Sequence, residues 1–91
     1  MIKISEADLH PHLKARMSQR GITMEEIEKV LNEGLEATDT KPGTIGKVFV
    51  FLYNGMWEGK LFEEKEVSVY YKLVNDTMVL LTVKARYGKG F

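Results

Sequence analysis

The spacing of the apolar residues changes once along this chain, from a helical period to an alternating one. Before residue 34 they recur every three or four positions, and from residue 47 onward they alternate or run together. At 91 residues the chain has room for one hydrophobic core. Helices followed by strands around one core predict a single α+β domain covering residues 1 to 91.

The first helix is predicted to begin near Asp8, a residue type that caps helices, and to end at Gly21. Leu9, Leu13 and Met17 recur at every fourth position. This spacing places the three side chains on one face, which we expect to be buried.

The second helix has the clearest start signal in the chain. Thr23 and Glu26 have the spacing of a capping box, and Ile22 and Ile27 have the spacing of a hydrophobic staple around it. Gly34 is a residue type that commonly ends helices. The residues expected on its inner face are Ile27, Val30 and Leu31.

Four strands are expected after a loop over residues 38–46, and they cover residues 47–53, 56–62, 67–74 and 78–87. The first is apolar on both faces, which favours a central position in the sheet. Asn54-Gly55 suits a type I′ turn and predicts a hairpin between the first two strands. Gly59 is a candidate for a β-bulge inside the second strand.

The apolar alternation predicts how the last two strands pair. A three-residue loop, Asn75 to Thr77, sets Leu73 opposite Val79 and keeps the apolar residues on one face. The opposite face then pairs Ser68 with Lys84, Glu66 with Arg86, and Tyr70 with Thr82. The predicted fold is a two-layer sandwich in which two N-terminal helices pack on an antiparallel sheet of about four strands.

Composition excludes several classes of function. Thirteen basic residues balance thirteen acidic ones, so the surface as a whole is not built for polyanions. The absence of cysteine removes disulfides, thiolate nucleophiles and zinc–sulfur sites. No apolar run is long enough to span a bilayer or to form a signal core, so we expect a cytoplasmic protein that does not bind membranes.

The most informative surface is a stripe of His12, Arg16 and Arg20, which recur every four residues along the first helix. Histidine can act as a base near neutral pH, and the arginine fork can hold two phosphate oxygens. A metal-independent ribonuclease needs these groups, so His12 and Arg16 are candidate catalytic residues. Candidate RNA-binding or anion-binding residues are Arg20, Lys84, Arg86 and Tyr70.

Structural roles are the alternative for each of these residues. His12 can cap or pack at the start of the helix, and Arg16 and Arg20 can form ion pairs with Glu25, Glu26 or Glu36. His10 and His12 lie two positions apart on a helix and point to different sides, so no metal is expected. We expect no cofactor either, since the chain has no glycine-rich phosphate loop, serine triad or paired-carboxylate motif.

The segment from His12 to Ile22 resembles the signature of an uncharacterised family of small bacterial and archaeal domains. That signature is His, three residues, Arg-Met, two residues, Arg-Gly-Ile, followed by a second helix and a sheet ending in Thr-Val, here Thr82-Val83. The family is grouped by fold with RelE-like and BrnT-like toxin ribonucleases. The resemblance implies metal-independent RNA cleavage, a partner antitoxin, and His12, Arg16 and Arg20 at the signature positions.

The sequence therefore supports two candidate functions. The first is a toxin-like domain that binds or cleaves RNA through the cationic stripe. The second is a non-catalytic protein-interaction module that uses an exposed sheet edge or the hairpin around Met56-Trp57, with a partner or a second copy of the chain.

Overall fold

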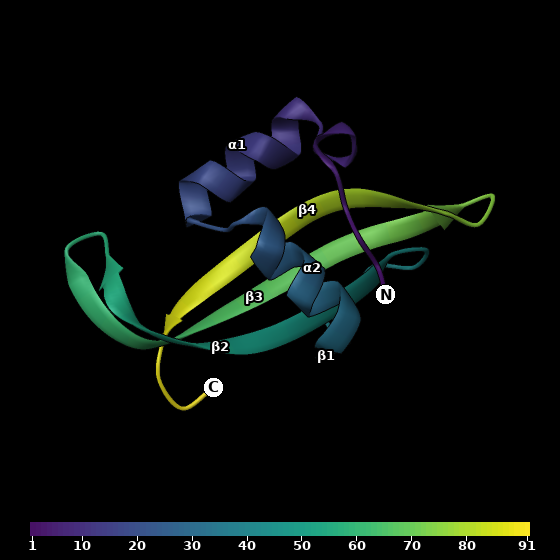
Figure 1. The fold of residues 1–91 in the computed structure, drawn as a ribbon. Coiled ribbons are helices and arrows are strands. Elements are labelled where there is room, and N and C mark those ends of the chain that lie inside the picture. Colours follow the sequence, from purple (N-terminus) through teal and green to yellow (C-terminus); the bar gives the residue numbers. More distant parts are fainter.

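The computed structural model describes residues 1–91 and has two layers (Figure 1). Two helices lie on one face of a single antiparallel sheet, whose strand order is β1-β2-β3-β4. This arrangement confirms the predicted α+β sandwich. In chain order the elements are the 3-10 helix η1 (Glu6–Asp8), α1 (Pro11–Arg20), α2 (Met24–Glu33), β1 (Leu35–Glu36), β2 (Ile45–Trp57), β3 (Lys60–Val74) and β4 (Thr77–Gly88).

The core lies between the helices and the helix-facing side of β3 and β4. Leu13 from α1 and Ile27 and Val30 from α2 are fully buried, as the spacing predicted. Leu9 is buried just before α1 begins, and Met17 is only partly buried. From the sheet, Val67 and Val69 are buried against them. α1 packs on β4, whereas α2 packs on β2 and β3, so each helix covers a different part of the sheet.

The start of α1 corrects the first prediction. Asp8 does not cap this helix, because it ends η1 and accepts a hydrogen bond from the backbone N–H of Ser5 at 2.8 Å. The N-cap of α1 is His10, whose Nδ1 accepts from the N–H of Leu13 at 3.2 Å. Its Nε2 lies 3.2 Å from the carbonyl oxygen of Leu80 on β4. Pro11 occupies the first helical position, where its missing N–H costs nothing.

Replacing His10 with alanine should lower the free energy of unfolding by about 1 kcal/mol, the usual cost of losing an N-cap acceptor. His10→Asn keeps a side-chain acceptor at the cap but loses the contact with Leu80, so it should lose clearly less. Urea denaturation at neutral pH measures both values. Equal losses in the two variants would show that the cap itself contributes nothing.

The ends of α2 follow the sequence closely. Thr23 Oγ1 accepts from the N–H of Glu26 at 3.1 Å, and the Glu26 carboxylate accepts from the N–H of Thr23 at 2.9 Å. Gly34 ends the helix in an extended conformation, with φ −72° and ψ 160°. A Cβ there would lie 2.9 Å from the carbonyl oxygen of Val48, so glycine allows the close approach of α2 to β2.

The first long hairpin turns later than predicted. Asn54 and Gly55 lie inside β2 at a bulge, and the turn is formed by Glu58 and Gly59, with φ values of 49° and 82°. Asn54 also has a positive φ, of 44°, but only the later turn lets Trp57 pair with Lys60. The expected strands 47–53 and 56–62 are therefore parts of two longer strands, and this hairpin curls beyond the helices at the left of Figure 1.

The β3–β4 turn also differs from the prediction. Asn75 and Asp76 form a two-residue turn with φ values of 51° and 64°, and Leu73 pairs with Met78 instead of Val79. A bulge follows between Tyr70 and Tyr71, after which the pairing is the predicted one. The extra residue that the prediction placed in the loop lies instead in the bulge, where Leu81 has no cross-strand partner, and Leu80 enters the core. The confirmed pairs are Ser68 with Lys84, Glu66 with Arg86, and Tyr70 with Thr82.

β2 is a central strand only at its beginning. β1 pairs with it at Lys47 and Val48 alone. Gly46 accepts a backbone hydrogen bond from Ala37, so the N–H and C=O groups of the even-numbered residues point toward β1. Beyond β1, the outward backbone groups of Val50 and Leu52 consequently lie at an open sheet edge.

Candidate functional site

The three residues of the predicted cationic stripe lie on α1, which Leu13 anchors against the core. His12 is exposed, and Arg16 and Arg20 are half-buried. The chain contains three arginines, of which Arg86 is paired with Glu66 at 2.8 Å. Neither Arg16 nor Arg20 takes part in any of the five ion pairs of the structure.

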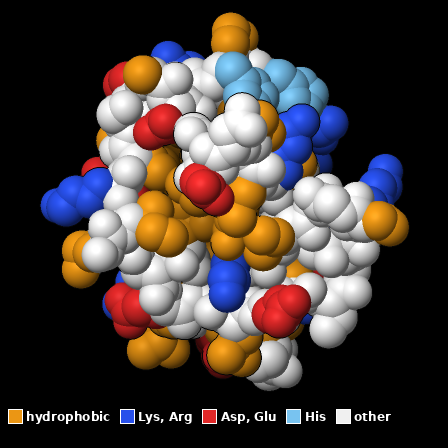
Figure 2. Space-filling view, turned by 90° about the vertical axis from the view of Figure 1, so that its right-hand side faces the viewer, with side chains coloured by type: hydrophobic (Ala, Val, Ile, Leu, Met, Phe, Trp, Pro, Cys, Tyr) orange, Lys and Arg blue, Asp and Glu red, His pale blue; other side chains and the backbone are white.

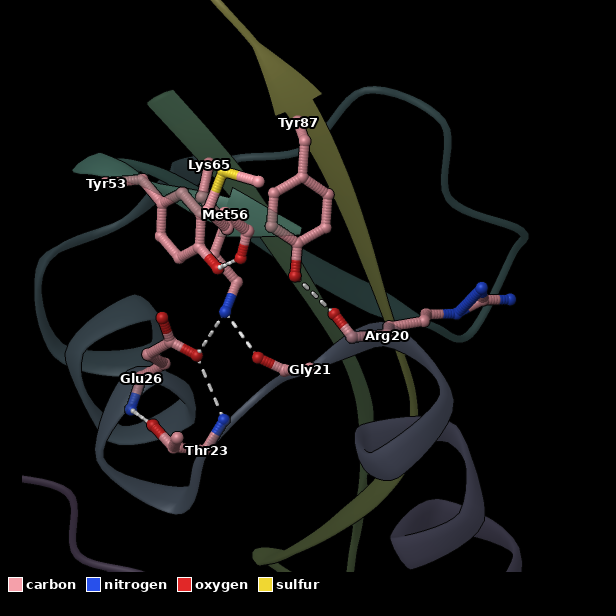
Figure 3. Close-up of polar contacts among 8 residues, drawn as sticks. All are labelled: Arg20, Gly21, Thr23, Glu26, Tyr53, Met56, Lys65 and Tyr87. Carbon is pink, nitrogen blue, oxygen red and sulfur yellow. Dashed lines mark hydrogen bonds and ion pairs between the residues drawn. The ribbon is translucent and has the colours of Figure 1, made fainter. Parts of the chain in front are cut away.

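The backbone at the end of α1 is held from the sheet. The hydroxyl of Tyr87 on β4 donates to the carbonyl oxygen of Arg20. The Arg20 side chain extends away from this contact, and its Nε is shielded from solvent without a hydrogen-bond partner (Figure 3). Gly21 then turns the chain with φ 68°, as predicted for the helix end. The backbone of Arg20 is thus held by β4 as well as by the helix.

A buried lysine connects the two helices to the sheet at this point (Figure 3). Lys65 on β3 is 3% exposed, and its Nζ donates to the carbonyl oxygen of Gly21 and to Oε1 of Glu26, the latter at 2.8 Å. The rings of Tyr53 and Tyr87 lie 5.5 and 5.6 Å from the same nitrogen. Glu26, which the sequence offered as a partner for the arginines of α1, is therefore paired with Lys65.

Sequence reasoning missed Lys65, although a signal was present. Lys65 alternates with the buried residues Val67 and Val69, so it belongs to the helix-facing side of β3. The nearby phenol is half-buried, and this partial burial raises the pKa of Tyr87 to about 12. Trp57 stacks on this ring at 4.8 Å and closes the cluster from the curled hairpin.

The other predicted site residues lie on the sheet face away from the helices. Tyr70 and Lys84 line a cavity of about 410 Å³ together with Arg86. The segment from Glu36 to Asp39 forms one wall of this cavity. A second cavity, of about 320 Å³, adjoins it and shares Asp39, Tyr70 and Lys84 with the first.

Carboxylates already accompany the cations of this face. The Tyr70 hydroxyl donates to both oxygens of Asp39 at 3.0 Å, and Lys84 approaches the same carboxylate at 3.5 Å. The hydrogen bond from Tyr70 lowers the pKa of Asp39. Burial, followed by the hydrogen bond to Asp39, raises the pKa of Tyr70. The hydrogen bond to Glu66 raises the pKa of Arg86.

The structure therefore separates the predicted site residues into two groups. No residue of α1 lines either cavity, so His12, Arg16 and Arg20 do not share a concave surface with Lys84, Arg86 and Tyr70. The reason is the alternation along β4, which directs Lys84 and Arg86 to one face of the sheet while α1 packs on the other. Each group has to be considered as a site by itself.

The two histidines lie side by side at the start of α1, not on different sides as predicted, because His10 is the N-cap and its backbone is extended rather than helical. Their rings are parallel and 6.1 Å apart, and Lys and Arg side chains lie next to them on the face shown in Figure 2. No group of three or more His, Cys, Asp or Glu side chains is placed to hold a metal ion. None of the helices has the length and apolar character needed to cross a membrane.

Fold and surface together define a small two-layer α+β domain that carries a cationic helix on one face of its sheet and a charged cavity on the other. A family model matches residues 9–84, and the chain belongs to that family, which is described as a domain of unknown function (DUF4258). Comparisons with curated proteins and with solved structures found no match.

Proposed function

We propose that this domain binds RNA in the cytoplasm through the cationic stripe formed by His12, Arg16 and Arg20 on α1. The observation that carries the proposal is that Arg16 and Arg20 have no carboxylate partner, whereas Arg86 and the buried Lys65 are both paired. An unpaired guanidinium can bind phosphate without first giving up an ion pair. His12 is exposed, and Arg16 and Arg20 keep part of their surface in solvent, where a polymer can reach them.

Binding is better supported than cleavage. Cleavage without a metal needs a base and fixed cations around one phosphate. The stripe supplies an exposed imidazole and two guanidinium groups on successive turns, but neither cavity includes them. The segment from His12 to Ile22 resembles the signature of a family that is grouped by fold with toxin ribonucleases, and this resemblance supports RNA as the ligand. It also makes a neutralising antitoxin the natural protein partner, with cleavage as the further step that His12 would serve.

Arg16→Ala and Arg20→Ala should each weaken RNA binding by about tenfold at low salt, because each removes one phosphate contact. The slope of log Kd against log salt should fall by about 0.7 to 0.9 per arginine removed. Fluorescence anisotropy with a labelled RNA in EDTA measures both quantities. Lys29→Ala is the matched control, since it removes the same charge from α2, where Lys29 is paired with Glu33 at 2.8 Å.

Absence of salt-dependent RNA binding by the unchanged protein, or equal losses in the control and the arginine variants, would overturn the proposal. Gel analysis of the same samples shows whether the RNA is cut. Cleavage that is lost in His12→Ala would extend the function from binding to catalysis.

A protein-interaction module is the second candidate, and the curled hairpin favours it. Met56 and Leu61 are direct cross-strand partners near its tip and remain 60% and 72% exposed. If two copies associate here, light scattering should show a mass that rises with concentration, and Leu61→Lys should abolish the rise. Leu73→Lys on the other hairpin, where Leu73 is 57% exposed, is the matched control. A strict monomer at every concentration would argue against self-association.

A further inference from the structure

The cavity on the sheet face away from the helices has the dimensions of a small-molecule site. Its volume of about 410 Å³ lies within the range of known ligand pockets. The floor is formed by β3 and β4, where the small side chain of Ser68 leaves room between larger neighbours. The wall from Glu36 to Asp39 closes one side. This cavity is separate from the proposed RNA-binding stripe and does not depend on it.

Charges of both signs line the cavity, and each cation is paired with a carboxylate. Arg86 pairs with Glu66 at 2.8 Å, and Lys84 pairs with Asp39 at 3.5 Å. Ser68 lies between Glu66 and Tyr70 on β3, directly opposite Lys84. The two ion pairs therefore occupy neighbouring positions along the strands, about 7 Å apart, and the small Ser68 side chain leaves space beside Lys84.

The two ion pairs differ in length: Lys84–Asp39 is 3.5 Å and Arg86–Glu66 is 2.8 Å. The Lys84–Asp39 contact is long, and both side chains are more than half exposed, so exchanging this partner costs little free energy. Asp39 stays ionised because the Tyr70 hydroxyl donates to both of its oxygens. Glu66 uses only Oε1 toward Arg86, so Oε2 is free to accept, and Glu36 takes part in no ion pair.

These charges restrict what can enter. Three carboxylates and two cations leave one negative charge, so an anion alone is disfavoured. A simple cation could balance that charge, but it would leave the loosely held Lys84 unused. A molecule with an ammonium and a carboxylate group can meet both kinds of partner, because its carboxylate can face Lys84 while its ammonium group faces Glu36 and the free oxygen of Glu66, and Asp39 keeps the hydrogen bond from Tyr70.

We infer that the cavity between the Glu36–Asp39 wall and strands β3 and β4 binds a small zwitterion of the amino-acid class, with its carboxylate toward Lys84 and its ammonium group toward Glu66 and Glu36. Two of the lining groups, Tyr70 and Arg86, also have raised pKa values, and such groups collect at binding sites.

The test is a titration of the isotope-labelled protein with glycine and with 4-aminobutyrate, followed by amide NMR. Saturable shifts are expected at Ser68, Lys84 and Ala37, with Kd values in the millimolar range for such small probes. Acetate and methylammonium, each carrying one of the two charges, should bind at least fivefold more weakly at matched ionic strength. Equal shifts from the single-charge probes, or no saturation with either zwitterion, would overturn the inference.

Glu66→Gln tests the role assigned to the carboxylate and keeps an oxygen that can accept from Arg86. It should weaken zwitterion binding at least threefold. Glu63→Gln is the matched control, because Glu63 is exposed on the same strand and lines neither cavity. Equal affinities in the two variants would contradict the proposed orientation. The amide spectrum of each variant shows directly whether the fold is intact.

Discussion

Replacing Lys65 with methionine is expected to lower the free energy of unfolding by about 3 kcal/mol, the largest effect of any single charge in this chain. The ammonium group is 3% exposed and is bound by the carboxylate of Glu26 and the carbonyl oxygen of Gly21. Methionine fills a similar volume but donates no hydrogen bond. The variant therefore leaves a carboxylate that is 19% exposed and a helix-end carbonyl without their shared donor.

Urea denaturation of Lys65→Met, Glu26→Gln and the double variant measures this coupling. The double variant should lose less than the sum of the single losses, because both variants break the same contact. Lys72→Met is the matched control on the same strand, where the side chain is exposed, and it should change stability by less than about 0.5 kcal/mol. A loss in Lys65→Met no larger than in the control would mean that the buried ion pair contributes nothing.

The second large effect is expected for Gly21→Ala, at about 3 kcal/mol of unfolding free energy. Gly21 has φ 68°, where an L-residue is strained, and an added Cβ would lie 2.4 Å from Cζ3 of Trp57. The tryptophan ring cannot easily move aside, because it is stacked on Tyr87 at 4.8 Å. Backbone strain and the steric clash should therefore add.

Gly43→Ala separates these two contributions. Gly43 has φ 82°, but nothing lies within 4 Å of the position of an added Cβ, so only backbone strain of about 1 kcal/mol is expected. Thermal denaturation of both variants gives the difference. A Gly21 variant that loses no more than the Gly43 variant would show that Trp57 shifts without cost.

The helices were predicted best where several local signals agree. At α2, the Thr23–Glu26 capping box and the Ile22–Ile27 staple specify the same start, and the structure confirms it. At α1, Asp8 has a better capping side chain than His10, but Asp8 already closes η1. The position of Leu80 on β4 then favours His10 as the cap, and no local pattern contains that distant contact.

The strands show where tertiary pairing overrides turn propensity. Asn54-Gly55 is the stronger hairpin sequence, yet its positive φ at Asn54 is used in a bulge, and Glu58-Gly59 forms the turn. At Asn75-Asp76 the expected three-residue loop is a two-residue turn, and the residue left over lies in a bulge inside the sheet. The pairing around Ser68 and Lys84 was nevertheless predicted correctly, because alternation fixes which residues face the core.

For the site, the sequence identified residue types but not which face of the sheet they occupy. His12, Arg16 and Arg20 share a helical stripe, and Lys84, Arg86 and Tyr70 share a strand face, as the periods predict. Whether the two groups meet depends on which face of β4 is covered by α1. The pattern of a single helix or strand does not predict that packing. Lysine is rarely buried, so Lys65 was not predicted to lie in the core.

The packing of α1 on β4 has a consequence for how the chain is made. The first long helix rests on the last strand, so a ribosome must add residues 77–88 before α1 has its sheet partner. At roughly 5–20 residues per second, this delay lasts on the order of several seconds. During synthesis the arginine-bearing helix therefore lacks its sheet partner beside the ribosomal RNA until β4 has been added.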